Sequence, residues 1–361
     1  MNTYSFLSYC ARVTCEGQHR RRLANAAQQF TNWETLPEQA EFHNLAPLAY
    51  HHLKAAGVEI PPDAKRSLLA LILRHRHAAQ VRQAVLGEFV SACQAAGIQV
   101  IVLKGAALAS LLYPEPELRP MRDLDVWVER ADLEEAHRLL TRLEGYDPHL
   151  EKEGPHVKHL MSGLRRDGLH VSVEIHFRLP GIRREKPVPF PVGTTGIVAH
   201  TLSYDEMLRH LCTHMAHHAN VFETTRLIWA ADAVGFAERF VERIDWAGLR
   251  KRSPETLNVL SLLHFLTPLP EAVIEGAGLK IGRAPRDVGA DFAGWPRLSL
   301  AAQRQKGLPR ILRDTLFPSE WWLCLHYELS CQHPLFWYRW VRHPLAIAGW
   351  TGRLIHDKIK K

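Results

Sequence analysis

The sequence predicts an α+β protein in which a small mixed sheet core is flanked by N- and C-terminal helical segments. Residues 100–103, VIVL, are apolar and mostly β-branched, which is typical of a buried strand. Residues 169–177, LHVSVEIHF, carry apolar side chains at every second position, which is typical of a half-buried strand. On either side, residues 64–96 and 203–218 repeat apolar side chains at helical spacing.

Size and composition are those of a folded protein with more than one part. A chain of 361 residues is long enough for two or three domains. Its hydrophobic content of 46% and charged content of 23% exclude the disordered class. We expect three regions: an N-terminal helical region over residues 1–97, a sheet core over residues 98–200 and a C-terminal helical region over residues 201–361.

The net charge and the cysteines indicate which partners and which cellular compartment to expect. The net charge of +7 permits an anionic partner such as a nucleotide, RNA or an anionic surface, but the basic residues are spread along the whole chain. The six cysteines form no C-x-x-C pair, which argues against a structural zinc site and fits reduced thiols. We see no signal peptide, and no apolar run approaches the roughly 20 residues that span a bilayer. We therefore expect a cytoplasmic protein.

The segment on which the site depends is residues 98–129. Its first strand ends in Lys104 and Gly105, and a short helix is expected next because AALASLLY follows. The prolines of PEPELRP stop that helix. Residues 123–128, DLDVWV, then begin a second strand, on which Asp123 and Asp125 share one face.

This pattern indicates a cation site beside a phosphate site. Two carboxylates that close together repel each other, and a bound cation such as Mg²⁺ relieves the repulsion. Unpaired amide groups at the start of the helix, at Gly105, and the ammonium group of Lys104 suit a phosphate. A lone Asp-x-Asp is common on solvated strand edges and a lone Lys-Gly is only a turn, but the two in this order favour the functional interpretation.

These residues resemble a known family. LKGAAL, followed by Arg119 and then RDLDVWV, is similar to the glycine-then-Asp-x-Asp signature of the polymerase-beta-like nucleotidyltransferase superfamily. More narrowly, the pattern resembles the bacterial family usually labelled uncharacterised nucleotidyltransferase. Ala106 stands where the superfamily usually has Gly or Ser, and the gap from Gly105 to Asp123 is longer than in its compact members. The resemblance implies that the sheet core is a nucleotidyltransferase core.

The resemblance also supplies a third carboxylate. The superfamily carries an acid on a later strand, and Glu174-Ile175-His176 matches the acid-x-His pattern of the narrower family. Asp123, Asp125 and Glu174 are then expected to be catalytic and to hold two Mg²⁺ ions. The alternative for Glu174 is a surface acid on an edge strand. His176 either orients Glu174, contacts the substrate or is a hydrogen-bonded structural histidine.

The basic residues of the same segment are expected to bind the nucleotide. The resemblance implies that Lys104 and the amides at Gly105 hold the phosphates of a nucleoside triphosphate (NTP). Arg119 or Arg122 would neutralise charge on the leaving pyrophosphate, or alternatively would form a salt bridge that orients the aspartates. The basic residues 183–186 lie in an interval, 180–196, that we expect to be a solvated loop or linker.

The implied activity is transfer of a nucleoside monophosphate from an NTP to an acceptor. The acceptor is open: a small hydroxyl compound, a protein and tRNA are candidates, and the basic charge slightly favours RNA. The alternative is a non-catalytic NTP-binding or scaffold protein that retains the fold. The three carboxylates argue against that alternative, whereas Ala106 and the long gap argue for it.

Two further features have competing interpretations. His210, His214 and His217 recur at helical spacing, and such histidines can bind zinc, but no H-E-x-x-H motif is present and packing is the preferred interpretation. The tail from residue 316 is rich in aromatic and basic residues, which suits a helical packing surface, nucleic-acid stacking or peripheral membrane contact. We favour packing and keep membrane contact as the alternative.

Overall fold

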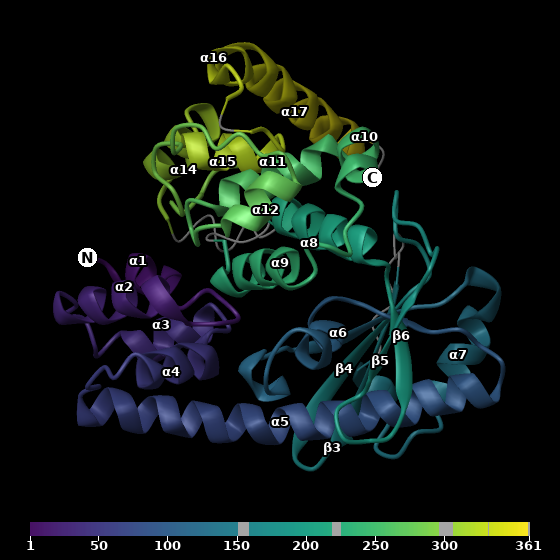
Figure 1. The fold of residues 1–361 in the computed structure, drawn as a ribbon. Coiled ribbons are helices and arrows are strands. Elements are labelled where there is room, and N and C mark those ends of the chain that lie inside the picture. The colour runs from purple at the N-terminus through teal and green to yellow at the C-terminus, as the bar shows by residue number, and fades with distance from the viewer. Residues whose placement is uncertain (151–158, 219–224, 296–305, 331, 360–361) are drawn as a thin grey trace. The chain divides into compact units, whose positions relative to one another are not determined.

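The computed structural model describes residues 1–150, 159–218, 225–295, 306–330 and 332–359. The chain forms two compact units, one of Met1–His210 with Gly235–Ile244 and the other of Leu211–Val234 with Asp245–Lys361. The elements of both units are labelled in Figure 1. The division of the chain into three regions stays a prediction.

The first unit begins with helices, as the sequence indicates. They are α1 (Thr3–Ser8), α2 (Gly17–Gln28), α3 (Leu36–Phe42), α4 (Ala46–Ala55) and α5 (Pro62–Ala95). The long helix α5 starts with a proline, which suits the first turn because that turn needs no amide donor. In Figure 1, α5 runs past the N-terminal helices and then past the sheet, and it contacts α3, α4, α7 (Leu133–Leu140) and the strand β4 (Leu169–His176).

The sheet of the first unit is mixed, which confirms the predicted fold class. Its strands in the described residues run in the order β3-β4-β2-β1-β6-β5. Neighbours β2 and β4 are parallel, as are β1 and β6, whereas the other neighbouring pairs are antiparallel. The bounds of the other strands are β1 (Ile101–Val102), β2 (Asp123–Trp127), β3 (His159–Arg166), β5 (Val188–Pro191) and β6 (Val198–Thr201). The helix α6 (Lys104–Leu111) follows β1, as predicted.

The interval 180–196 is not simply a loop, so that prediction was wrong in part. It contains β5, which pairs with β6 at the edge of the sheet. Pro189 and Pro191 lack the amide donor that a central strand needs, which explains both the edge position and the expectation of a loop. Arg184 in the basic stretch is held by the core: its Nη1 lies 2.7 Å from Glu129 Oε1, and its guanidinium lies 5.3 Å from the Trp127 ring centroid.

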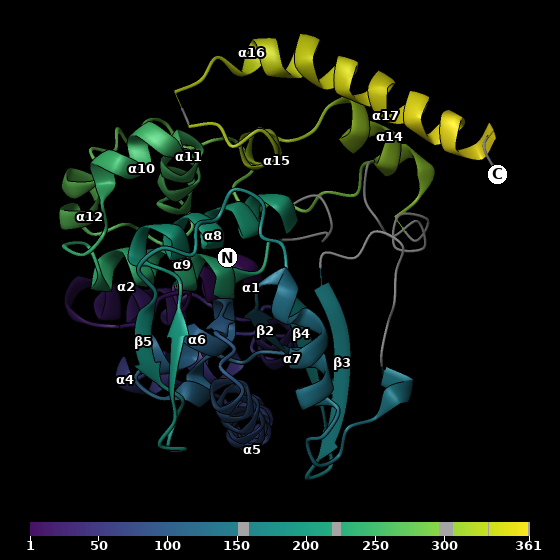
Figure 2. The ribbon, with the colours of Figure 1, turned by 90° about the vertical axis from the view of Figure 1, so that its right-hand side faces the viewer.

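The remaining helices follow the sheet along the chain, and Figure 2 gives a second view of them. They are α8 (Tyr204–His218), α9 (Leu227–Arg239), α10 (Trp246–Arg252), α11 (Pro254–Leu263), α12 (Glu271–Gly276), α14 (Leu308–Leu316), α15 (Glu320–His326), α16 (Leu335–Trp337) and α17 (His343–Ile359). In the described residues, no helix combines the length and the hydropathy that crossing a bilayer requires.

The aromatic tail divides into a packed part and an exposed part. Trp322 is 2% exposed and packs with Phe292 and Leu323 in a core of the second unit, which agrees with the favoured packing interpretation. Phe336 and Trp337, in contrast, are 74% and 56% exposed. Exposed aromatic side chains of this size are what the membrane alternative requires, and that alternative stays a prediction.

Candidate active site

The predicted carboxylates meet on two neighbouring parallel strands. Asp123 and Asp125 lie on β2, and the register of β2 with β4 sets Asp125 opposite Glu174. Residues opposite each other on neighbouring strands point to the same face of the sheet, and residues two apart on one strand share that face. All three carboxylates therefore gather on one face, which we call the carboxylate face.

The pKa values of the three carboxyl groups are shifted in different directions. Burial and the neighbouring Asp125 raise the pKa of Asp123. Burial together with Asp125 and Asp123 raises the pKa of Glu174 to about 7. Burial would also raise the pKa of Asp125, but Lys104 and His176 outweigh it and hold that pKa well below its usual range. Of the three, Asp125 holds its negative charge most strongly, and a further cation beside the face would favour the ionised forms of the other two.

Lys104 supplies one cation to the carboxylate face. Its Nζ lies 2.9 Å from Asp125 Oδ1, and its side chain is 19% exposed. Burial would lower the pKa of Lys104, but Asp125, Asp123 and Glu174 raise it above the usual value. The residue has a φ of 45° at the start of α6, a conformation that is rare outside glycine and is enriched at functional sites.

The predicted arginines have different positions. A Cβ added at Gly105 would lie 3.1 Å from Nη1 of Arg119, so the buried guanidinium rests directly against the glycine. Arg119 is close enough to Asp123 to lower the pKa of that carboxyl group, although burial and Asp125 raise it more. Arg122 is exposed and forms no ion pair with any residue that the structure describes.

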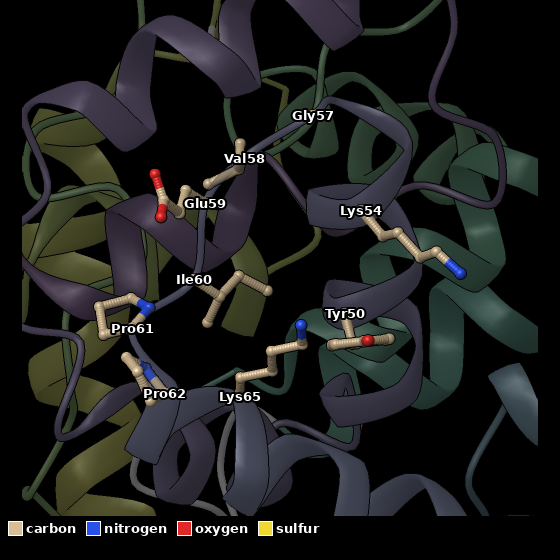
Figure 3. A pocket seen from close by; sticks show the side chains of 9 residues that line it. All are labelled: Tyr50, Lys54, Gly57, Val58, Glu59, Ile60, Pro61, Pro62 and Lys65. Carbon is tan, nitrogen blue, oxygen red and sulfur yellow. The ribbon is translucent and has the colours of Figure 1, made fainter.

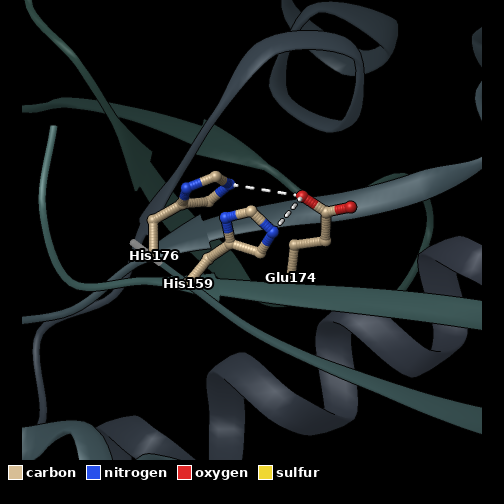
Figure 4. Close-up of side chains that lie close together, drawn as sticks. All are labelled: His159, Glu174 and His176. Atoms are coloured by element: carbon tan, nitrogen blue, oxygen red, sulfur yellow. Dashed lines mark ion pairs between the residues drawn. The ribbon is translucent and has the colours of Figure 1, made fainter. Parts of the chain in front are cut away.

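Two histidines complete the carboxylate face. Nε2 of His176 lies 2.8 Å from Oδ1 of Asp125 and 3.7 Å from Oε2 of Glu174. Nε2 of His159, on β3, lies 3.7 Å from the same Glu174 oxygen. Figure 4 shows both rings turned toward that oxygen. Burial and the neighbouring His176 lower the pKa of His159.

His159 was missed because its interval, residues 147–168, is polar and rich in His and Gly and was expected to form a hairpin excursion, with no strand paired to residues 169–177. The sequence signal for it is the pair Asp167-Gly168, because Asp-Gly is a preferred pair for a two-residue hairpin turn. In the structure the two residues have the positive φ values, 46° and 75°, that such a turn requires. Such a turn fixes the register of β3 with β4, which sets His159 opposite His176. Reading the Asp-Gly pair as a hairpin turn would have found the residue.

Two more residues near the carboxylate face come from helices. Arg82 of α5 is largely buried, which lowers its pKa, and Asp123 is close enough to act against that shift. His210 of α8 is 9% exposed, and burial, followed by Lys104, lowers its pKa to about 3. Helical periodicity gives α5 and α8 a buried face, but it does not indicate which residue of that face meets the sheet.

Two of the other α8 histidines, His214 and His218, pack against an aromatic side chain, whereas His217 is exposed. The rings of His214 and His218 are 4.2 Å apart, and each lies 5.3 Å from the ring of Trp229. Among the described residues, the side chains whose ligand atoms cluster closely enough for a metal are His159, Glu174 and His176 instead. This arrangement supports packing as the preferred interpretation of His214.

A hollow of about 840 Å³ lies elsewhere in the first unit, at the turn between α4 and α5. Figure 3 shows Tyr50, Lys54 and Lys65 among its lining residues. None of the carboxylate-face residues lines this hollow. Its volume alone therefore does not connect it with the predicted chemistry.

Comparison with known proteins identifies the family. The family model described as uncharacterised nucleotidyltransferase matches residues 30–273. A crystal structure of an antigenic nucleotidyltransferase-like protein from Paracoccidioides brasiliensis is similar at 15% identity and a TM-score of 0.34, over 54% of this chain and 97% of that chain, a likeness too low to carry an argument. No curated protein matches. The match over most of the chain shows that this protein belongs to the uncharacterised nucleotidyltransferase family.

Proposed function

We propose that the protein is a metal-dependent nucleotidyltransferase that moves a nucleoside monophosphate from an NTP to a hydroxyl-bearing acceptor. The observation that carries the proposal is the meeting of Asp123, Asp125 and Glu174 on one face beside the start of α6. Membership of the family supports the general class of reaction. The donor base and the acceptor are not specified by these residues, and a small hydroxyl compound, a protein and tRNA are the acceptors to test.

The carboxylate face fits divalent metal ions. Carboxylate oxygens are hard ligands of the kind Mg²⁺ prefers, and a few of them suffice because waters and phosphates complete its coordination. Burial and, after it, the neighbouring carboxylates raise the pKa values of Asp123 and Glu174, and a bound cation would offset both effects. Asp123, Asp125 and Glu174 would hold two Mg²⁺ ions. Bound Mg²⁺ would neutralise charge on the triphosphate and polarise the acceptor oxygen.

The protein's own residues would bind and orient the triphosphate. The first amides of α6, at Gly105, point out of the helix start and favour an anion there. Lys104 pairs with Asp125 in this structure, and its flexible ammonium would move to a phosphate oxygen when nucleotide binds. Arg119, held against Gly105, would neutralise charge on the leaving pyrophosphate. Arg122 is exposed, so it would help to neutralise the charge of the pyrophosphate only when bound nucleotide covers its side chain.

The proposed reaction is an in-line displacement. An acceptor oxygen attacks the α-phosphorus, the new phosphate ester forms as the bond to pyrophosphate breaks, and the proton of the acceptor hydroxyl leaves to solvent. Holding the two reactants in line and stabilising the charge that develops supply most of the rate in such reactions. His176, hydrogen-bonded to Asp125, would fix the orientation of that carboxylate during the displacement.

A thermal-shift titration tests the proposal. Each NTP is added with and without Mg²⁺ to the wild type, to Asp123→Asn/Asp125→Asn and to a control, Asp63→Asn, which changes a 95%-exposed carboxylate. A ligand at 100 times its Kd stabilises the folded state by about 2.7 kcal/mol, which raises Tm by several degrees. We expect Mg²⁺-dependent stabilisation in the wild type and the control and its loss in the double variant. Equal stabilisation of all three proteins would refute the assignment, and no stabilisation of the wild type would favour the scaffold alternative.

A further inference from the structure

The strands β3 and β4 bring three potential metal ligands together next to Asp125. Nε2 of His159 and Nε2 of His176 each lie 3.7 Å from Oε2 of Glu174, and the three ligand atoms all lie within 4.8 Å of one another. Figure 4 shows that the two imidazole rings approach the same carboxylate oxygen from neighbouring positions. The histidines are opposite each other in the β3–β4 register, so the arrangement is set by the backbone of a hairpin.

We propose that His159, Glu174 and His176 form a site for a transition-metal ion with borderline-soft character, of which Zn²⁺ is the probe. Two imidazoles and one carboxylate are a ligand set that zinc uses in catalytic sites, where a fourth position stays open to water or substrate. Mg²⁺ avoids imidazole ligands, whereas zinc and its neighbours in the first transition row accept them. The inference goes beyond the proposed function because metal binding at these residues does not require nucleotide transfer. Glu174 and the His176–Asp125 hydrogen bond also belong to the proposed Mg²⁺ site, so zinc would replace that arrangement where it binds.

The distances favour a metal over direct hydrogen bonds. A gap of 3.7 Å between nitrogen and oxygen is too long for a hydrogen bond, so neither histidine is bound to Glu174 in that way. Ligand atoms about 2.0–2.2 Å from a tetrahedral zinc ion are about 3.3 Å from one another. The two histidine–Glu174 distances of 3.7 Å are within a few tenths of an ångström of that value, and rotations of the His159 and Glu174 side chains would bring the two histidine nitrogens, which lie within 4.8 Å of each other, to the same spacing.

The surroundings suit an ion that enters from solvent and is held by the sheet. The His159 side chain is 31% exposed and gives access, whereas Glu174 and His176 are 16% and 10% exposed. Asp125 Oδ1, 2.8 Å from His176 Nε2, would give up that hydrogen bond and either join the metal or keep its contact with Lys104. Either way the ion would lie at the edge of the carboxylate face and reduce its negative charge.

The experiment measures Zn²⁺ binding to the metal-free full-length chain by isothermal titration calorimetry. The variants are His159→Gln and a matched control, His170→Gln, which removes an exposed histidine from the neighbouring strand β4 on the same face of the sheet. We expect a wild-type site for one ion, at least tenfold weaker binding in His159→Gln and unchanged binding in His170→Gln. Zinc-edge X-ray absorption of the wild-type complex should show scattering from two imidazole ligands.

Several outcomes would overturn the inference. The inference is overturned if the wild type and His159→Gln bind zinc with equal affinity. It is also overturned if the wild type does not bind zinc at micromolar concentration, or if the absorption spectra are dominated by sulfur ligands. Mg²⁺–NTP stabilisation of the wild type is measured in parallel. Zinc binding without nucleotide stabilisation would reject only the proposed function, and nucleotide stabilisation without zinc binding would reject only this inference.

Discussion

Two of the groups of neighbouring histidines in the described residues have different surroundings. His214 and His218 lie one turn apart on α8, and their rings pack around Trp229. His159 and His176 are far apart in sequence, yet their ring centroids lie 4.9 Å apart because β3 pairs with β4. Only the second group shares a carboxylate at metal-ligand spacing among the described residues.

The difference teaches that spacing along one helix is a weak indicator of a metal site. Residues four apart on a helix are neighbours whatever their role, so the pattern arises in packed aromatic clusters as readily as at ligands. A hairpin register brings together side chains from two strands, and here the parallel partner β2 adds Asp125 on the same face. The site arises where three strands meet.

The largest expected effect separates the carboxylate face from the α8 histidines. Asp125→Asn should reduce transfer by about 10³-fold, because the neutral amide no longer offers the charge that holds metal and Lys104. His214→Gln should leave transfer unchanged. The measurement is the transfer of label from α-labelled NTP to the small-molecule, protein and tRNA fractions of a bacterial extract. A loss of transfer in His214→Gln, or its survival in Asp125→Asn, would reverse the comparison.

A smaller effect concerns stability at the same face. Lys104→Met leaves the Asp125 carboxylate beside Asp123 and Glu174 without its ammonium partner, and breaking a buried pair in this way costs about 3 kcal/mol. We expect urea denaturation to show that loss and Mg²⁺ to restore part of it. The matched control, Lys65→Met, removes an exposed lysine. If both variants are equally stable, Lys104 does not carry the charge balance proposed for the face.

The smallest expected effect is on stability, at a third place where a histidine contacts a carboxylate, between the helices α3 and α5. Glu41 of α3 lies 2.7 Å from His75 of α5 and also contacts Arg74. Burial raises the pKa of Glu41, but these partners outweigh it and the net pKa is lowered. A carboxyl group whose pKa is lower in the folded state stabilises the protein above its unfolded pKa of about 4.5, and that stability is lost as pH falls through the folded pKa.

Glu41→Gln should therefore lower the free energy of unfolding at pH 7 by about 0.2–1 kcal/mol, since the pair is partly exposed. The difference from the wild type should shrink as the pH falls below 4.5. Urea denaturation at a series of pH values measures it, and Glu38→Gln, an exposed change on the same helix, is the control. A difference that grows toward low pH would contradict the assigned ion pair.

The sequence by itself determined the local parts of the site. The alternation of residues 123–128 placed Asp123 and Asp125 on one face, and the same period in residues 169–177 aligned Glu174 with His176, because strand side chains alternate regardless of what the strand packs against. The order of strand, Lys104-Gly105, helix and strand was likewise readable, since turns and prolines act within a few residues. These features are confirmed as β1, α6, β2 and β4.

The tertiary structure decided which of these parts meet. Nothing in the local pattern makes β4 the parallel neighbour of β2, yet that pairing sets Glu174 opposite Asp125. The same holds for the contacts of Lys104 with Asp125, Arg119 with Gly105 and Arg82 with Asp123, because the partners lie on separate elements or connections of the fold. The physical reason is that periodicity fixes the direction of a side chain relative to its own backbone, whereas contact between distant segments depends on how whole elements pack.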